Sequence, residues 1–138
     1  MKLIVCLSND AGMMFNNRRQ SRDSALIERL IEIVGTHKIY AEAYSKTLFK
    51  DCSLNNSIFF NKDIDWSTID ESDYVFVEDP ELFKNAPIFD QVIVCWWNRE
   101  YPSDKFFRIN MASYESVKTE TLVGRSHNEI EIEYYVKG

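Results

Sequence analysis

Two apolar runs constrain the fold more than any other feature of the sequence. They cover Lys2–Leu7 (KLIVCL) and Gln91–Trp97 (QVIVCWW), and neither alternates between apolar and polar residues. A strand with one solvated face alternates in this way, whereas a strand that is covered on both faces reads as a continuous apolar run. The two runs therefore predict central strands of a sheet that is packed on both faces.

A helix is predicted after the first strand. From Ala25 to Val34 apolar residues recur at helical spacing, and Gly35 is well placed to end the helix. Ser21 or Asp23 can cap its start, because either side-chain oxygen can accept a hydrogen bond from a backbone N–H of the first turn. Short strands are also predicted at Lys38–Ala41, Ser57–Phe60, Asp73–Glu78 and Phe106–Ile109. Short helices are predicted at Glu42–Phe49 and after Asp79. Met13–Phe15 is predicted to be an apolar patch within a loop.

The C-terminal region predicts an antiparallel hairpin. Tyr114–Val123 and Glu129–Val136 both alternate, and a turn that contains Gly124 separates them. Helices between early strands imply parallel crossovers, whereas a hairpin adds antiparallel strands. We therefore predict a single α/β domain over residues 1–138, with a mixed, mainly parallel sheet, helices on both faces and a C-terminal antiparallel hairpin.

The balance of charge narrows the range of partners. The net charge is −6 and the sequence pI is near 4.9. A nucleic-acid-binding face needs clustered Lys and Arg, so direct nucleic-acid binding is not expected, whereas a basic protein partner would suit this charge. One face of the last strand carries three acids, Glu129, Glu131 and Glu133. This face is either the solvated side of the hairpin or an acidic stripe that binds a basic protein.

The cysteines and the N-terminus predict a cytoplasmic protein. Cys6, Cys52 and Cys95 are widely spaced and form no CxxC pair, so neither a zinc site nor a redox motif is predicted. Cys6 and Cys95 lie in apolar runs and are predicted to be buried free thiols, which fits a reducing compartment. The sequence begins with a strand pattern rather than a signal peptide, and no apolar run is long enough to span a membrane.

An arginine-rich segment precedes the first helix. Arg18, Arg19 and Arg22 could bind a phosphate or carboxylate beside the helix N-terminus. Arg99 could join them, because it follows a buried strand and sites in open α/β sheets gather at the carboxyl ends of strands. The alternative is a solvated loop whose arginines pair with nearby acids. The first alternative predicts a small anionic ligand.

Asp23 and His127 are the candidate catalytic residues. Asp23 could transfer a proton if it is buried in a cleft, and the alternative is that it only caps the helix. His127 lies beside a turn and could act as an acid or base, or only form hydrogen bonds at the surface. No Ser–His–Asp or Cys–His arrangement can be read from the spacing of these residues.

The order of the elements resembles dihydrofolate reductase. Three parts of the sequence carry the resemblance, namely LIVCLSNDAGMMFN, DYVFVEDPELFKNAPIFDQVIVCWW, and FFRINMASYESVKTE with RSHNEIEIEYYVK. The resemblance implies the fold of that family, and it implies that Asp23 stands where the family has its catalytic acid.

The motifs of that family are replaced at its cofactor site. Arg18-Arg19-Gln20 stands where the family has Leu-Pro-Trp before the acid. Glu42-Ala43-Tyr44-Ser45 stands where a Gly-Arg-x-Thr signature helps to hold the NADPH phosphate, and Glu78-Asp79 stands where a Gly-Gly pair lets the cofactor approach the backbone. Both changes bring acids to the phosphate site, so no NADPH or other cofactor is expected.

Three short segments resemble small bacterial proteins that carry the name ribonuclease Z. The segments are FNNRRQSRD, WNREYPSD and RSHNE. Enzymes of that name resemble the metallo-β-lactamases, which hold two zinc ions in a His-x-His-x-Asp-His cluster. This chain has only His37 and His127, far apart in sequence, so no metal site is predicted.

These observations predict a small cytoplasmic binding protein with a degenerate dihydrofolate reductase-like fold, non-catalytic and without a cofactor. One concrete form is an immunity-type protein that neutralises a basic nuclease toxin by charge complementarity. The alternative is an enzyme, such as a hydrolase or nuclease, with an arginine-rich site for a phosphate or nucleotide. An NADPH-dependent reductase is the third alternative.

Overall fold

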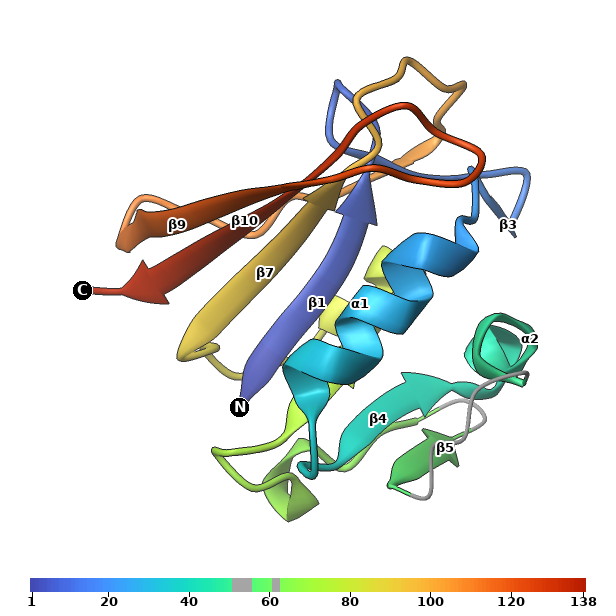
Figure 1. Ribbon diagram of the computed structural model, residues 1–138. Helices are drawn as coiled ribbons and strands as arrows, with labels where there is room; N and C mark the ends of the chain where they lie inside the picture. The colour runs from blue at the N-terminus through green and yellow to red at the C-terminus, as the bar shows by residue number, and fades with distance from the viewer. Residues whose placement is uncertain (51–55, 61–62) are drawn as a thin grey trace.

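The two apolar runs become adjacent central strands of a seven-stranded sheet (Figure 1). The computed structural model describes residues 1–50, 56–60 and 63–138. β1 (Lys2–Leu7) and β7 (Gln91–Trp96) pair in parallel along their whole length. Successive residues of β1 face opposite sides, so that Leu3 packs in one apolar cluster and Ile4 in the other. Both faces of these strands are covered, as their continuous apolar sequence predicts.

The sheet is mixed and mainly parallel, as predicted, in the order β5-β4-β6-β1-β7-β10-β9. Five neighbouring strands are parallel, and β10 is antiparallel to both β7 and β9. The predicted C-terminal hairpin is therefore confirmed. The remaining strands are β4 (Ile39–Glu42), β5 (Ser57–Phe60), β6 (Tyr74–Phe76), β9 (Tyr114–Leu122) and β10 (Ile130–Lys137).

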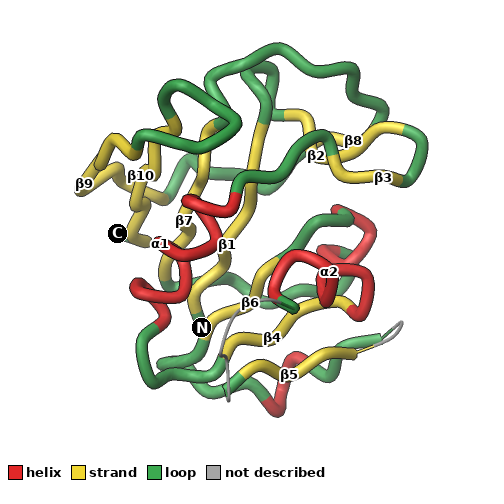
Figure 2. Tube along the Cα trace, turned by 45° about the vertical axis from the view of Figure 1, so that its right-hand side comes forward, coloured by secondary structure: helices red, strands yellow, loops and turns green. Residues whose placement is uncertain are grey.

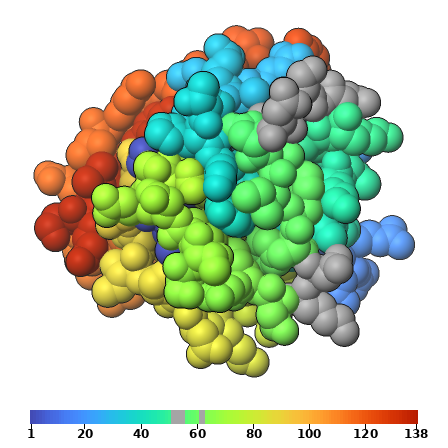
Figure 3. All heavy atoms as spheres, turned by 90° about the horizontal axis from the view of Figure 1, so that it is seen from below, coloured from blue at the N-terminus to red at the C-terminus, as the bar shows by residue number. Residues whose placement is uncertain are grey.

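The two faces are covered differently. α1 (Ser24–Val34) and the short α2 (Lys46–Phe49), which follows the 3-10 turn η1 (Ala43–Ser45), pack on one face (Figure 1). On the other face, the helices found among the described residues are the 3-10 turns η2 (Trp66–Thr68) and η3 (Pro80–Phe83). They contribute Trp66, Leu82 and Phe83 to the second cluster. Seen from below, few atoms of the first strand (dark blue) remain visible among the covering segments (Figure 3).

A small second sheet corrects the prediction of a loop at Met13–Phe15. Its order is β3-β2-β8, with β2 at Gly12–Phe15, β3 at Arg18–Arg19 and β8 at Lys105–Phe106 (Figure 2). Asn16 and Asn17 both have positive φ, 51° and 57°. Asparagine tolerates this region, which a two-residue type I′ hairpin turn requires at both central positions. The sequence interpretation overlooked this turn, and the hairpin directs Arg19 towards the main sheet.

The first helix begins and ends as the sequence predicts. Asp23, rather than Ser21, is the N-cap, and its carboxylate accepts a hydrogen bond from the N–H of Ala25 at 2.9 Å. Gly35 ends the helix with φ of 60°, and its N–H donates to the carbonyl of Ile31. The buried residues of the helix are its apolar stripe, Leu26, Ile27, Leu30 and Val34.

None of the helices within the described ranges is both long enough and apolar enough to cross a membrane. Cys6 and Cys95 are free thiols at paired positions of β1 and β7; Cys95 is buried and Cys6 is partly buried. Cys52 lies outside the described residues.

Candidate functional site

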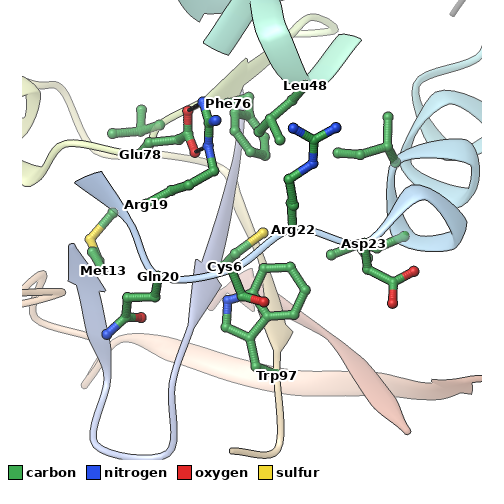
Figure 4. A pocket seen from close by; sticks show the side chains of 14 residues that line it. Cys6, Met13, Arg19, Gln20, Arg22, Asp23, Leu48, Phe76, Glu78 and Trp97 are labelled. Atoms are coloured by element: carbon green, nitrogen blue, oxygen red, sulfur yellow. Dashed lines mark hydrogen bonds and ion pairs between the residues drawn. The ribbon is translucent and has the colours of Figure 1, made fainter. Parts of the chain in front are cut away.

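A narrow pocket lies at the carboxyl ends of the parallel strands, where ligand sites of open α/β sheets are found (Figure 4). Its free volume in this conformation is about 20 Å³, which is enough for one water molecule. Its polar side carries Arg19, Gln20, Ser21, Arg22, Asp23 and Glu78, and its apolar wall contains Cys6, Leu26, Ile27, Leu48, Phe76 and Trp97.

Arg19 is held by an acid of the main sheet. Its guanidinium donates to both carboxylate oxygens of Glu78, at 2.7 and 3.0 Å, and to the carbonyl of Tyr44 at 3.1 Å (Figure 4). The guanidinium also lies over the Tyr44 ring, 4.4 Å from its centroid. Burial opposes the charge of Arg19, but the bonds to Glu78 outweigh this and raise the pKa of Arg19. This arginine is therefore committed to Glu78 rather than open to an anion.

Two carboxylates fill the end of β6. Glu42 accepts hydrogen bonds from the backbone N–H groups of Glu78 and Asp79, at 3.0 and 3.1 Å. Glu78 in turn accepts a hydrogen bond from the Ser45 hydroxyl at 2.7 Å. Burial raises the pKa of Glu42, although the two N–H groups act in the opposite direction. The N–H groups that follow this strand are thus occupied by a side chain of the protein itself.

Asp23 is buried and ties the start of α1 to the turn before β10. Besides the cap to Ala25, its carboxylate accepts hydrogen bonds from the backbone N–H groups of Arg125 and Ser126, at 3.2 and 2.8 Å, and from the Ser126 hydroxyl at 3.0 Å. The carboxylate points away from Arg19 and Glu78 (Figure 4). Burial opposes its ionisation, but the bonds from Ser126 and Arg125 outweigh this and hold the pKa of Asp23 well below its usual range.

His127 is part of the same network, and the expectation of a surface histidine is wrong. Only 4% of the residue is exposed, because its ring stacks on Trp97 at a centroid distance of 4.7 Å. Its Nδ1 lies 3.1 Å from an Asp23 oxygen, and its Nε2 lies 3.0 Å from both the Ser21 hydroxyl and the Tyr101 hydroxyl. The two candidate catalytic residues are therefore in contact, and Ser21 joins them.

The four candidate anion-binding arginines do not form one cluster. Arg22 is exposed, lines the pocket and extends towards Leu48, and its side chain pairs with no other described residue (Figure 4). Arg18 is exposed in a separate shallow groove with Tyr101. Arg99 is exposed and is not among the residues that line this pocket. Arg22 is therefore the arginine that is free to meet a ligand in the pocket.

The predicted acidic stripe is only partly available. Glu129 is exposed, and Glu131, which is partly buried, has no hydrogen-bond or ion-pair partner in the described part of the chain. Glu133 accepts hydrogen bonds from the Trp96 indole at 3.2 Å, the Ser116 hydroxyl at 2.7 Å and the Tyr135 hydroxyl at 2.7 Å. Burial opposes its ionisation, but these three bonds outweigh this and lower the pKa of Glu133.

Sequence reasoning missed Ser21 as a partner of His127 and Glu42 as a partner of the strand end. Ser21 and His127 are separated by 106 positions, and Glu42 and Glu78 by 36. The Ser-His pair before the last strand was visible in the sequence, but nothing in the spacing could reveal which residue faces it. Across the described residues, no group of three or more His, Cys, Asp or Glu side chains is arranged to hold a metal ion.

Comparison with known proteins supports the fold alone. No family model matches the chain, and no curated protein matches it either, so the resemblance to the ribonuclease Z group stays a prediction. Among solved structures, the chain is similar to dihydrofolate reductase from Enterococcus faecalis in complex with NADP(H) and RAB-propyl. The TM-score is 0.74 at 13% sequence identity, over 99% of this chain and 95% of the other. The chain therefore has a dihydrofolate reductase-like fold.

Proposed function

We propose that this protein is a binding protein that uses no dinucleotide cofactor, and is not a reductase. The observation that carries the proposal is the occupation of the β6 end by Glu42 and Glu78. A dinucleotide phosphate at this place would meet two carboxylates and would find the N–H groups of Glu78 and Asp79 already bonded. Displacing Glu42 would cost those bonds, and the like charges would repel the phosphate.

NADPH is expected to leave the melting temperature of this protein unchanged. The assay would use NADPH at about 1 mM, the upper end of ordinary enzyme–substrate affinities. A ligand at 100 times its dissociation constant would add about 2.7 kcal/mol to the free energy of unfolding, which a thermal-shift assay detects easily. A dihydrofolate reductase serves as the positive control. Saturable stabilisation by NADPH, with oxidation of NADPH in the presence of dihydrofolate, would overturn the proposal and favour the reductase.

The pocket points to a small organic anion as the ligand. Its wall is apolar, and Arg22 brings an unpaired positive charge to its polar side. An apolar pocket with a few placed polar groups is the usual form of a small-molecule site. A guanidinium beside such a wall suits a carboxylate or phosphate attached to a small apolar body.

Arg22→Gln is expected to abolish stabilisation by small carboxylates and phosphate esters in the same thermal-shift assay. A charge-assisted hydrogen bond contributes about 1.5–3 kcal/mol to the free energy of binding. Its removal should therefore lower the affinity at least tenfold. Arg99→Gln is the matched control, since Arg99 is also an exposed arginine but is not among the residues that line this pocket. Equal losses in both variants would show that the effect is only one of net charge.

A basic protein, such as a nuclease toxin, is the second candidate ligand. The net charge of −6 and the unpaired Glu129 and Glu131 support it. In a panel of basic bacterial nuclease toxins, co-expression of this chain is expected to restore growth against at least one toxin. The double variant Glu129→Lys/Glu131→Lys should lose this protection, because like charges across an interface cost several kcal/mol. Protection that survives the charge reversal would exclude this surface.

A further inference from the structure

We propose that Ser21, His127 and Asp23 form a nucleophilic site that hydrolyses small anionic carboxylic esters in the pocket. The proposal rests on the pocket as the ligand site and goes beyond binding. The expectation of a non-catalytic protein depended on the lack of any catalytic arrangement in the residue spacing. The fold assembles one from two distant segments: Ser21 and Asp23 before and at the start of α1, and His127 before β10.

The hydrogen bonds define the state of the imidazole. An ionised carboxylate only accepts hydrogen bonds, so Nδ1 of His127 must carry the proton that faces Asp23 at 3.1 Å. In the neutral ring Nε2 then has one lone pair, and the Ser21 and Tyr101 hydroxyls both lie 3.0 Å from it. When Tyr101 donates to Ser21 Oγ, at 3.3 Å, the Ser21 hydroxyl is the donor to Nε2. This is the tautomer in which a histidine can remove a proton from a serine, and Asp23 acts as the positioning residue.

The burial of the three groups suits nucleophilic catalysis, which needs an accessible nucleophile and a shielded base. Ser21 is partly buried and lines the pocket. His127 is not among the residues that line the pocket, and the side chains of His127 and Asp23 are only 2% and 0% exposed. Stacking on Trp97 limits rotation of the imidazole. The nucleophile can therefore meet a ligand while the base is shielded from water.

The lining of the pocket selects the substrate class. Arg22 follows the nucleophile directly in the chain and supplies an unpaired positive charge, so the ester should carry a carboxylate or phosphate elsewhere in the molecule. The free volume of about 20 Å³ holds one water molecule, so any acyl group must displace the wall of the pocket, and a short acyl group displaces it least.

The reaction consumes water and needs no cofactor. Ser21 Oγ forms a bond to the carbonyl carbon while its proton passes to His127 Nε2. The ester C–O bond then breaks, and the same proton passes to the alkoxide, which leaves as the alcohol. Water attacks the acyl-Ser21, gives a proton to Nε2, and the Ser21–acyl bond breaks to release the acid as the proton returns to Ser21 Oγ. The Tyr101 hydroxyl donates to Ser21 Oγ at 3.3 Å and can orient it towards Nε2.

A small alkyl fluorophosphonate tests the proposal, because it modifies serines that a neighbouring base activates. We expect intact-mass spectrometry to show one added group per chain, and peptide mapping to place it on Ser21. Ser21→Ala should abolish the modification. Ser24→Ala is the matched control and should react like the natural chain, since Ser24 is an exposed serine that bonds Arg125 and not His127.

Two further variants test the base and its orientation. His127→Gln should slow the modification by about 100-fold or more, the usual contribution of a general base. Asp23→Asn can still accept hydrogen bonds but would favour the other imidazole tautomer. Asp23→Asn should therefore react slowly, whereas Asp23→Glu, which restores a carboxylate beside Nδ1, should recover part of the rate.

Three results would overturn the proposal. They are no modification of the natural chain, modification at a residue other than Ser21, and an unchanged rate in His127→Gln. Peptide mapping on the natural chain decides the question even if a variant does not fold. Binding of small anions through Arg22 is measured separately, so a protein that binds but does not react would lose the nucleophilic site and keep the binding function.

Discussion

Asp23→Ala is expected to lower the free energy of unfolding by about 3–5 kcal/mol, because several buried donors lose their acceptor together and each unsatisfied donor costs about 1–3 kcal/mol. The Asp23 carboxylate is 0% exposed and accepts hydrogen bonds from three backbone N–H groups, the Ser126 hydroxyl and the His127 ring. Alanine would leave these donors buried without an acceptor. Urea unfolding followed by circular dichroism measures the loss.

Asp65→Ala is the matched control for the cap alone. Asp65 also caps a helical turn, through the N–H of Ser67 at 3.1 Å, but it is exposed and forms no hydrogen bond or ion pair with a distant segment in the described part of the chain. Its replacement should cost about 1 kcal/mol, the usual contribution of an N-cap. If Asp23→Ala cost no more than Asp65→Ala, Asp23 would be an ordinary cap and the buried network would contribute little.

The same carboxylate predicts a dependence of stability on pH. Its pKa in the folded protein is lowered, since hydrogen bonds from Ser126 and Arg125 outweigh the opposing effect of burial. A group with a lowered folded pKa stabilises the protein above its unfolded pKa, which is about 3.9 for aspartate, and loses this contribution as pH falls through the folded value. Stability should therefore fall steeply below about pH 4, and Asp23→Asn should flatten that fall.

Arg19→Ala is expected to have the second largest effect, a loss of about 3 kcal/mol. The side chains of Arg19 and Glu78 are 17% and 8% exposed, so removal of the guanidinium leaves a nearly buried carboxylate without its charged partner. Glu42 bonds to the backbone N–H of the same Glu78, which adds a second acid to the unpaired site. Thermal and urea unfolding measure the loss.

The double variant Arg19→Met/Glu78→Gln separates the charge from the packing. Methionine fills much of the arginine volume, and glutamine keeps an acceptor for the Ser45 hydroxyl without a charge. We expect this variant to recover more than half of the loss, because a buried ion pair that is replaced as a unit often costs little. If it were as unstable as Arg19→Ala, lost contacts with Tyr44 and Thr47, rather than the unpaired charge, would be the cause.

Sequence patterns were enough to identify the elements that depend on local interactions along the chain. The continuous apolar runs of β1 and β7 identified central strands, and the alternation of β9 and β10 identified a hairpin, because side-chain direction follows the local period of the backbone. Asp23 and Gly35 marked the ends of α1 for the same reason: capping depends on residues within one helical turn. The resemblance to dihydrofolate reductase supplied the remaining topology.

The contacts between polar side chains from distant segments could be identified only in the folded structure. Ser21 and His127 come together across 106 positions, and Glu42 reaches the N–H groups of Glu78 across 36. Arg19 turned inward to Glu78, whereas Arg99 stayed at the surface, although both are arginines in polar loops. These contacts depend on strand order and on the paths of loops from separate elements. The local periodicity of the sequence reveals neither the strand order nor the loop paths. The pocket, the Arg19–Glu78 ion pair and the Ser21–His127–Asp23 arrangement can therefore be recognised only in the folded structure.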